Sequence, residues 1–402
     1  MSSVRHQSES GDGSVEAIVP VHHAARPVGR TVQSLLMQRE SLRELQASLH
    51  ITVVCHNIAA PAIREVLGLA RTTADVSLRE YSDDVRSPAG PKNFALSSAQ
   101  AEFVTFVDSD DYLEPGSLAA WLTRARDTGA AAVLAPVRTP NGTILTTPGL
   151  RPSKPTVLDP LKDGLATRSL PFGLLRVSSL QRLGFRFTEG LSVGEDLEPT
   201  LRLLFSGHVI SYPYGSPAYR QTDDAAEGRV TATLAPLGEE FRWLGPLTKQ
   251  GWLLALPLSH RRSIALKLMR IHGIGALLRR GEAIVQRAEV SSGPGLESAV
   301  LWNANEQQAW RSFQREIENL AEGALATLSR RDAQLAETAG ATDDPVVLAA
   351  ARSRYQVSNR RAELMTKKLG SVMARESIIR HYIRENRRRA ARVFDSRAEP
   401  IG

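Results

Sequence analysis

Short apolar runs alternate with amphipathic stretches along the first half of the chain. Four apolar runs have the length of buried strands, at residues 15–21, 51–55, 102–107 and 131–137. Between the first two runs, residues 28–49 have the polarity pattern of a helix. Strand-like runs separated by helices predict an α/β fold with a mostly parallel, doubly wound sheet.

The pattern changes near residue 235, where strand-like runs give way to long stretches rich in Ala, Leu, Arg and Glu. Helical segments are expected at residues 262–290, 296–336, 345–369 and 371–394. Asp344 followed by Pro345 has the chemistry of a helix start, and Gly370 is a candidate end for that helix. We therefore predict three parts: a polar tail over 1–13, an α/β domain over 14–235 and an all-α domain over 236–402.

Composition adds limits to this picture. Apolar residues make up 42% of the 402 residues and charged residues 23%, close to a globular average, which excludes a fibrous or wholly disordered chain. The polar residues 1–13 lack the apolar core of a signal peptide. A single cysteine, Cys55, excludes an intrachain disulfide and a cysteine zinc cluster. These features predict a cytoplasmic protein, with the inner face of the membrane as one site of action.

Positive charge is concentrated near the C-terminus. Residues 352–397 hold 14 Lys and Arg against four Asp and Glu, a net charge of +10, whereas the whole chain carries +7. The last predicted helix has one apolar stripe, formed by Val372, Ile379, Ile383, Ala390 and Phe394. Three interpretations remain open: a packed helical layer with solvated arginines, a basic helix resting on an anionic membrane, or self-association. Nucleic-acid binding ranks last, because aromatic residues are only 5% and no recognised module is present.

Candidate chemistry begins where the third apolar run ends, at Asp108-Ser109-Asp110-Asp111. Ligands of open α/β sheets bind at the carboxyl ends of the strands. Clustered carboxylates there suit a hard divalent cation that also binds phosphate oxygens. The alternative is a polar turn, since Asp and Ser favour turns and Glu114-Pro115 has the chemistry of an ordinary helix start.

Residues around this cluster carry a family resemblance. Residues 90–118 read GPKNFALSSAQAEFVTFVDSDDYLEPGSL, and residues 18–23 read IVPVHH. Together they resemble family-2 glycosyltransferases of the GT-A fold, over roughly residues 15 to 235. The resemblance implies an inverting enzyme that uses Mn²⁺ or Mg²⁺. It would move a sugar from a nucleotide-sugar donor to a surface glycan, a lipid-linked acceptor or a protein acceptor.

The same resemblance implies roles for individual residues. Asp108 and Asp110 hold the metal against the donor diphosphate, and Asp196, beside Glu195, is the general base. The donor pocket is lined by Pro20, His22, Lys92 and Asn93, with Arg220 and Arg229 as candidates for the phosphates. Other interpretations stay open, because carboxylates at 195 and 196 also suit a helix start and each arginine also suits a surface loop.

One segment departs from the family pattern. The family's second strand usually ends in Asp-Asp-Gly-Ser, whereas this chain has Cys55-His56-Asn57. His56 and Asn57 can hydrogen-bond a base, or His56 can be structural. Asp83 and Asp84 are candidates for the missing carboxylate, and the identity of the donor stays open.

Two rival functions remain. A nucleotidyltransferase needs a glycine-rich phosphate loop after its first strand, and residues 20–23 do not supply one. A catalytically degenerate glycosyltransferase fold that serves as an interaction module is the second rival, and the altered residues 55–57 agree with it.

Overall fold

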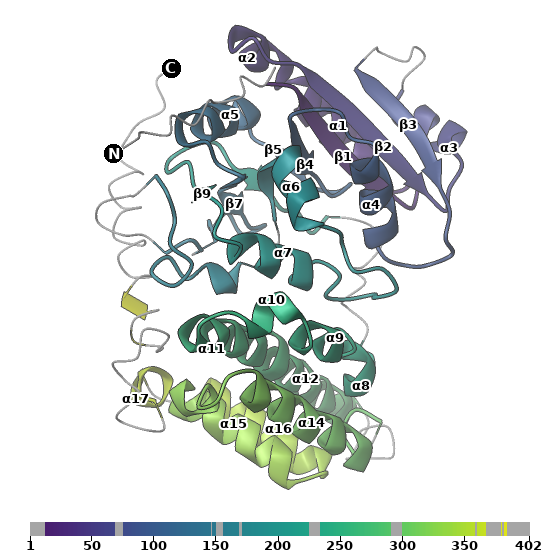
Figure 1. Cartoon of the computed structure of the whole chain (residues 1–402). Helices are drawn as coiled ribbons and strands as arrows, with labels where there is room; N and C mark the ends of the chain where they lie inside the picture. Colours follow the sequence, from purple (N-terminus) through teal and green to yellow (C-terminus); the bar gives the residue numbers. More distant parts are fainter. Residues whose placement is uncertain are drawn as a thin grey trace, which may run out of the picture. The chain divides into compact units, whose positions relative to one another are not determined.

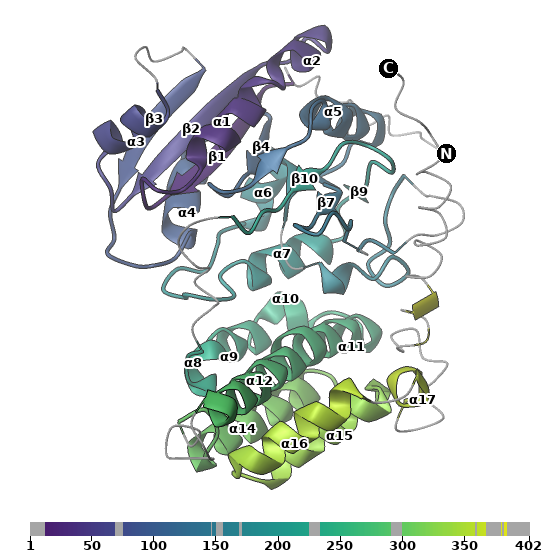
Figure 2. The same cartoon turned by 180° about the vertical axis from the view of Figure 1, so that it is seen from behind.

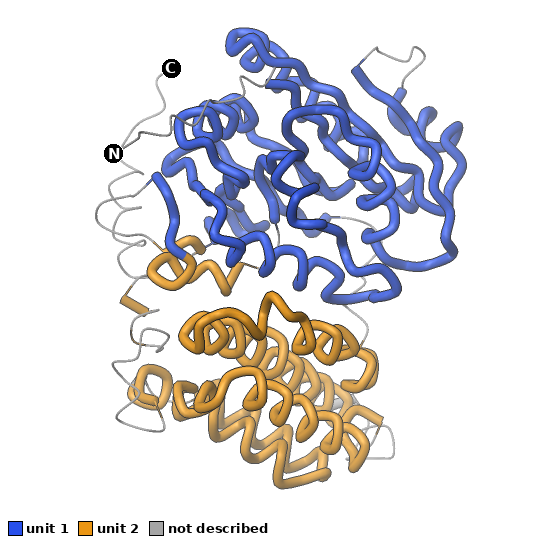
Figure 3. Tube along the Cα trace, viewed as in Figure 1, with its two compact units in different colours: residues 1–146, 152–159, 169–229 blue, residues 147–151, 160–168, 230–402 orange. Residues whose placement is uncertain are grey.

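The computed structural model describes residues 13–68, 75–145, 147–149, 156–168, 171–224, 234–290, 300–357 and 360–366, together with 379, 382 and 383. The chain divides into two compact units (Figure 3). The α/β unit comprises residues 1–146, 152–159 and 169–229, and the helical unit comprises residues 147–151, 160–168 and 230–402.

A seven-stranded sheet organises the α/β unit, in the order β3-β2-β1-β4-β8-β6-β9. Its strands are β1 (Val15–Val21), β2 (Leu49–His56), β3 (Val76–Tyr81), β4 (Phe103–Phe106), β6 (Ala132–Leu134), β8 (Gly173–Arg176) and β9 (Ile210–Ser211). Strands β3, β2, β1 and β4 run parallel, while β8 is antiparallel to β4 and to β6. The predicted mostly parallel sheet is confirmed.

Strand β1 lies at the centre of the parallel half. Val15 is in register with Leu49 on one side and with Phe103 on the other, and every residue of β1 is buried. Such a strand needs cover on both faces. Helices α1 (Val28–Leu36) and α5 (Ser117–Thr128) share one apolar cluster with β1, and α4 (Ala89–Ser97) packs on β1 and β2 from the other face (Figures 1 and 2).

Two predicted elements of this half differ in the structure. The helix expected over 28–49 is instead α1, a second helix α2 (Arg39–Glu44) and the start of β2. Gln46 adopts a left-handed φ of 54° between α2 and β2, which ends the helical path. The strand expected over 131–137 divides at Pro136, which has no N–H for a sheet ladder. Its second part, β7 (Val137–Arg138), joins a small sheet in the order β5-β10-β7, with β5 (Tyr112–Leu113) and β10 (Tyr219–Arg220).

Helices dominate the described part of the unit that follows. They are α8 (Leu237–Glu240), α9 (Leu244–Thr248), α10 (Gly251–Leu254), α11 (Leu258–Lys267), α12 (Gly275–Val290), α14 (Ala304–Leu320), α15 (Arg330–Ala341), α16 (Pro345–Gln356) and α17 (Arg360–Leu364). The long helices expected at 262–290 and 296–336 are interrupted, the first by a π-helical turn at Leu268–Ile274. Asp344 caps α16 as predicted, because its side chain accepts from the Val346 N–H at 2.8 Å.

Two further observations concern the predicted C-terminal helices and the possibility of a membrane span. Gly370 and nearly all of residues 371–394 lie outside the described residues. No helix in the described part of the chain is both long enough and apolar enough to traverse a bilayer.

Candidate functional site

The carboxyl ends of the parallel strands bring several predicted site residues to one edge of the sheet. Pro20 is buried in β1, and His22 follows β1 as an exposed residue. His56 ends β2, and Asp108 begins the turn after β4. The prediction that the acidic turn lies at this edge follows from strand direction alone, and the structure agrees with it.

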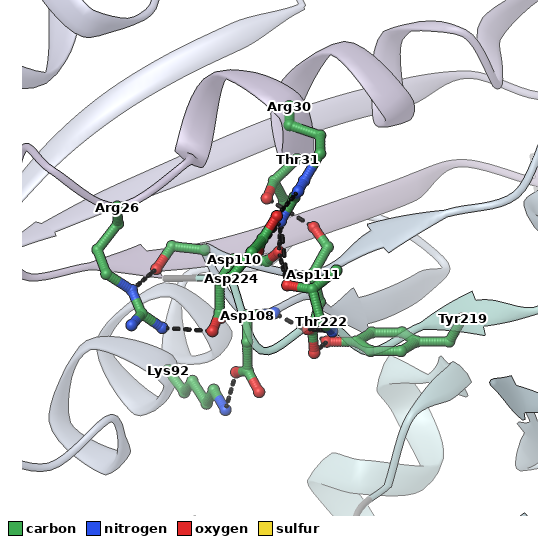
Figure 4. A network of polar contacts seen from close by, with 11 residues as sticks. Arg26, Arg30, Thr31, Lys92, Asp108, Asp110, Asp111, Tyr219, Thr222 and Asp224 are labelled. Atoms are coloured by element: carbon green, nitrogen blue, oxygen red, sulfur yellow. Dashed lines mark hydrogen bonds and ion pairs between the residues drawn. The ribbon is translucent and has the colours of Figure 1, made fainter. Parts of the chain in front are cut away.

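Each aspartate of the turn has different partners (Figure 4). Asp108 accepts a hydrogen bond on Oδ1 from Lys92 Nζ at 3.0 Å, and its side chain is 35% exposed. Asp110 forms an ion pair through Oδ2 with Arg26 Nη2 at 2.8 Å and is buried. Asp111 is also buried, but its partners are uncharged.

Asp111 joins the turn to β10. Its Oδ2 accepts from the Tyr219 hydroxyl at 2.8 Å, and its Oδ1 accepts from the Thr222 N–H at 2.9 Å. The Tyr219 hydroxyl in turn accepts from the Asp108 N–H at 3.1 Å. Burial, together with the nearby charge of Asp108, raises the pKa of Asp111 to about 7. Asp111 therefore holds the backbone of the turn in place and is less suited than Asp108 to bind a ligand.

Two arginines that the sequence did not single out contact the turn from the β1–α1 side. Arg26, just before α1, donates to Ser109 Oγ at 3.4 Å as well as pairing with Asp110. Arg30, in α1, donates to the carbonyl of Asp110 and forms an ion pair with Asp224 at 2.5 Å. A carboxylate cluster needs counter-charges, and that need is the signal in the sequence that points to such cations.

Lys92 donates to Asp108 and is also close enough to Glu195 and Asp196 to feel their charges. It is only 4% exposed, and its ammonium lies 5.5 Å from the Phe187 ring centroid. Burial would lower the pKa of Lys92, but the charges of Asp108, Glu195 and Asp196 outweigh burial and raise it. The lysine therefore stays charged beside both acidic pairs.

The second acidic pair precedes α7 (Leu197–Leu204). Asp196 is buried in the position before the helix, yet its side chain makes no capping hydrogen bond. Burial raises the pKa of Glu195, although the charge of Lys92 opposes the change. The helix-start interpretation thus explains the position of Asp196 but gives its carboxylate no capping role.

Asn93 contacts a loop of its own unit. Its amide nitrogen donates to the Phe187 carbonyl at 2.9 Å and to Glu189 Oε1 at 2.8 Å, and its oxygen accepts from the Phe187 N–H at 2.9 Å. These contacts fix residues 187–189 beside Lys92. They make Asn93 a residue that positions this loop.

Residues 55–57, which depart from the family pattern, contact the segment after β3. His56 Nε2 lies 2.7 Å from Asp83 Oδ1, and the Asn57 side chain accepts from the N–H groups of Asp83 and Asp84. Asp83 is the carboxylate that meets His56, whereas Asp84 is exposed and has a left-handed φ of 54°. Burial would raise the pKa of Asp83, but the hydrogen bonds from His56 and the Val85 N–H lower it.

Gly90, at the start of α4, leaves room for that carboxylate. A Cβ added at Gly90 would lie 2.5 Å from Asp83 Oδ2 and 2.7 Å from the Tyr81 ring. Such a distance is far below van der Waals contact, so a larger residue at Gly90 would displace the Asp83 carboxylate or the Tyr81 ring.

The remaining predicted residues are less informative. Arg220, in β10, forms a long ion pair with Glu114 at 3.8 Å. Arg229 lies outside the described residues. Across the described ranges, no group of three or more His, Cys, Asp or Glu side chains is arranged to hold a metal ion. Asp108 and Asp110 have the hard oxygen ligands that Mg²⁺ or Mn²⁺ prefers, but each already faces a cation.

Comparisons with known proteins agree with the resemblance. Residues 81–184 match the family model for glycosyl transferase family 2. A 224-residue stretch is 23% identical to poly(ribitol-phosphate) beta-N-acetylglucosaminyltransferase TarS of two Staphylococcus aureus strains. That match covers 56% of this chain and 38% of the relatives, so the chain spans well under half the length of the curated relatives it matches.

Solved structures extend the likeness to the fold. The S. aureus TarS 1–349 crystal structure in complex with UDP-GlcNAc aligns with a TM-score of 0.62 and 18% identity, over 85% of this chain and 91% of that one. The TarS 1–349 complex with UDP gives a TM-score of 0.59. The predicted resemblance to family-2 glycosyltransferases and the predicted GT-A fold are both confirmed.

Proposed function

We propose that the chain is an inverting glycosyltransferase that transfers a sugar from a nucleotide-diphosphate donor to a hydroxyl acceptor. The observation that carries the proposal is the buried Lys92, which donates to Asp108 and whose pKa is also raised by the charges of Glu195 and Asp196. A charged lysine close to both Asp108 and the Glu195-Asp196 pair suits a diphosphate that leaves near Asp108 while Asp196 deprotonates an acceptor hydroxyl.

The chemistry assigns a step to each group. Asp196 takes the proton of the acceptor hydroxyl, whose oxygen forms a bond to the anomeric carbon. The bond between that carbon and the diphosphate oxygen breaks, and Lys92 stabilises the charge on the departing nucleotide diphosphate. Asp108 and Asp110 are the residues that would hold a divalent cation, and that cation would supply Lewis-acid stabilisation of the same diphosphate.

For the donor we propose a uridine-diphosphate sugar, with UDP-GlcNAc as the first to test. The crystallised TarS fragment binds UDP-GlcNAc, and its fold matches this chain. His56 and Asn57 at the end of β2, together with Asp83 after β3, offer hydrogen-bonding atoms for the base in place of the usual aspartate.

For the acceptor we propose an anionic surface polymer. TarS is named for transfer to poly(ribitol-phosphate), which is a polyanion. The net charge of +10 over residues 352–397 suits such an acceptor, because phosphate-rich chains attract clustered lysine and arginine.

The test combines binding and turnover on the full chain. UDP binding with Mn²⁺ is measured by calorimetry, and transfer from UDP-GlcNAc by release of UDP. We expect Asp196→Asn to lower kcat by about 10²- to 10⁴-fold and to leave UDP binding unchanged, because a general base acts only in the chemical step. Asp108→Ala should abolish the Mn²⁺-dependent part of UDP binding.

The control is Asp127→Asn, at an exposed position near the end of α5, which should behave as wild type. If Asp108→Ala and Asp196→Asn both transferred sugar at the wild-type rate, these roles would be contradicted. Absence of binding to any nucleotide or nucleotide sugar, with or without metal, would favour the interaction-module alternative.

A further inference from the structure

Each carboxylate proposed to bind the metal has its own cation. Lys92 Nζ lies 3.0 Å from Asp108 Oδ1, and Arg26 Nη2 lies 2.8 Å from Asp110 Oδ2 (Figure 4). Two negative and two positive side chains leave these four groups close to neutral. A divalent cation that arrives alone must displace Arg26 from Asp110 before it can bind both carboxylates.

The two cations are held with different strength. Lys92 is buried, and Asp108, Glu195 and Asp196 together stabilise its charge. We therefore expect it to stay in contact with Asp108. Asp108 moreover has an oxygen that does not bond Lys92, on a side chain that is 35% exposed. The contact that obstructs a metal is therefore the one at Asp110.

Arg26 is the arginine of the turn with fewer side-chain contacts. Its side-chain partners in the described part of the chain are Asp110 and Ser109, and the Ser109 hydrogen bond is long at 3.4 Å. It lies before the first residue of α1, outside any helix or strand. Arg30, its neighbour on the turn, is instead fixed by Asp110, Thr222 and Asp224.

We propose that Arg26 occupies the place of the metal at Asp110 in the donor-free protein and is transferred to the diphosphate when the donor binds. This inference rests on the proposed function and deepens it. A guanidinium binds phosphate oxygens as well as it binds a carboxylate, so the arginine exchanges one anion for another. Metal binding then depends on the presence of the diphosphate, and Arg26 is a positioning residue of the donor site.

The first experiment measures Mn²⁺ binding to the full chain without nucleotide, by calorimetry. We expect Arg26→Gln to bind Mn²⁺ about tenfold more tightly than wild type, a change that corresponds to about 1.4 kcal/mol, because Asp110 loses its competing cation. Arg26→Lys should restore the weak wild-type binding. Arg39→Gln is the matched control, since Arg39 forms a surface ion pair with Asp75 and should leave Mn²⁺ binding unchanged.

A double-mutant cycle assigns the effect to Asp110. In an Asp110→Asn background, Arg26→Gln should no longer tighten Mn²⁺ binding, because the contested ligand is gone. Unchanged or weaker Mn²⁺ binding in Arg26→Gln overturns the proposal. An equal gain in the Asp110→Asn background also overturns it, because the effect would then be long-range charge alone.

The second experiment adds UDP at saturating Mn²⁺, with Mn²⁺–UDP association in buffer subtracted. Arg26→Gln should bind UDP about tenfold more weakly than wild type, opposite in sign to its effect on the metal alone. UDP affinity equal to that of wild type would overturn the transfer to the diphosphate. If wild type itself binds neither UDP nor any other nucleotide, the proposed function fails, whereas the donor-free Mn²⁺ cycle still decides whether Arg26 competes for Asp110.

Discussion

Two clusters of buried charge, one in each unit, look alike in composition but differ in how completely their groups are satisfied. In the helical unit, Arg280 is 1% exposed and bonds Glu240, Glu306 and the Ala235 carbonyl. In the α/β unit, Arg26 and Lys92 bond Asp110 and Asp108, and the Asp108 side chain is 35% exposed.

The difference separates a structural cluster from a reactive one. Arg280 links α12 to Glu240 of α8 and to Glu306 of α14. Glu306 also accepts from the Leu237 N–H, so both carboxylates are bonded within the helical unit. At the acidic turn, Asp108 has one hydrogen bond from Lys92, and Asp110 has one ion pair with Arg26. Burial of charge alone therefore does not identify a site, whereas the acidic turn combines a partly exposed carboxylate, Asp108, with a cation that has few partners, Arg26.

Removal of the guanidinium from the helical cluster has the largest expected effect on stability. Arg280→Met keeps much of the side-chain volume but leaves Glu306 with only the Leu237 N–H, and we expect unfolding to become easier by about 3–5 kcal/mol. Urea unfolding followed by circular dichroism checks this value. Below the unfolding transition, UDP binding should be unchanged.

The control for this prediction is Arg39→Met, which removes a surface ion pair and should cost at most about 1 kcal/mol. A loss of stability in Arg280→Met no greater than that of the control would mean that the cluster in the helical unit is not structural.

A second prediction concerns pH and the same unit. His272 lies in the π-helical turn beside the Trp243 ring, and burial lowers its pKa to about 3. Because the folded pKa lies below the unfolded value of about 6.5, the unfolded state binds more protons between these values, and stability falls as pH decreases through that window. At pH 5 this effect of His272 lowers the free energy of unfolding by about 2 kcal/mol relative to neutral pH, and His272→Gln should remove that loss.

The measurement is urea unfolding at pH 7 and pH 5 for wild type, His272→Gln and the exposed-site control His23→Gln. The control should keep the wild-type difference between the two pH values. An equally large difference in His272→Gln would show that other groups cause the acid sensitivity.

The sequence predicted the parts of the α/β unit that depend on local pattern. Continuous apolar runs marked β1, β2 and β4, and the acidic turn after β4 lies at the expected edge of the sheet. Strand β3 was missed because it alternates apolar and polar residues, as a partly exposed strand does, and so presents no continuous apolar run.

Partners far apart in the chain could not be predicted. Arg30 meets Asp224, 194 positions away, and nothing in either local sequence marks the pairing. The choice between Asp83 and Asp84 was equally hidden, because it depends on the left-handed backbone at Asp84 and on Asn57, which accepts from both N–H groups. Local sequence identified the carboxylates, and the tertiary fold selected their counter-charges.

The smallest expected effect comes from removing one tyrosine hydroxyl in each unit. Tyr219→Phe removes the partner of the Asp108 N–H and of Asp111 Oδ2, and we expect a loss of about 1–2 kcal/mol in stability together with weaker Mn²⁺-dependent UDP binding. Tyr355→Phe removes the hydroxyl that donates to the buried Asp332 at 2.9 Å, and is the matched variant in the helical unit. It should lose similar stability and no UDP affinity, because its partner lies in a cluster with no proposed ligand. Equal losses of UDP affinity in both variants would mean that Tyr219 acts through global stability, whereas a loss confined to Tyr219→Phe assigns it to the alignment of the acidic turn.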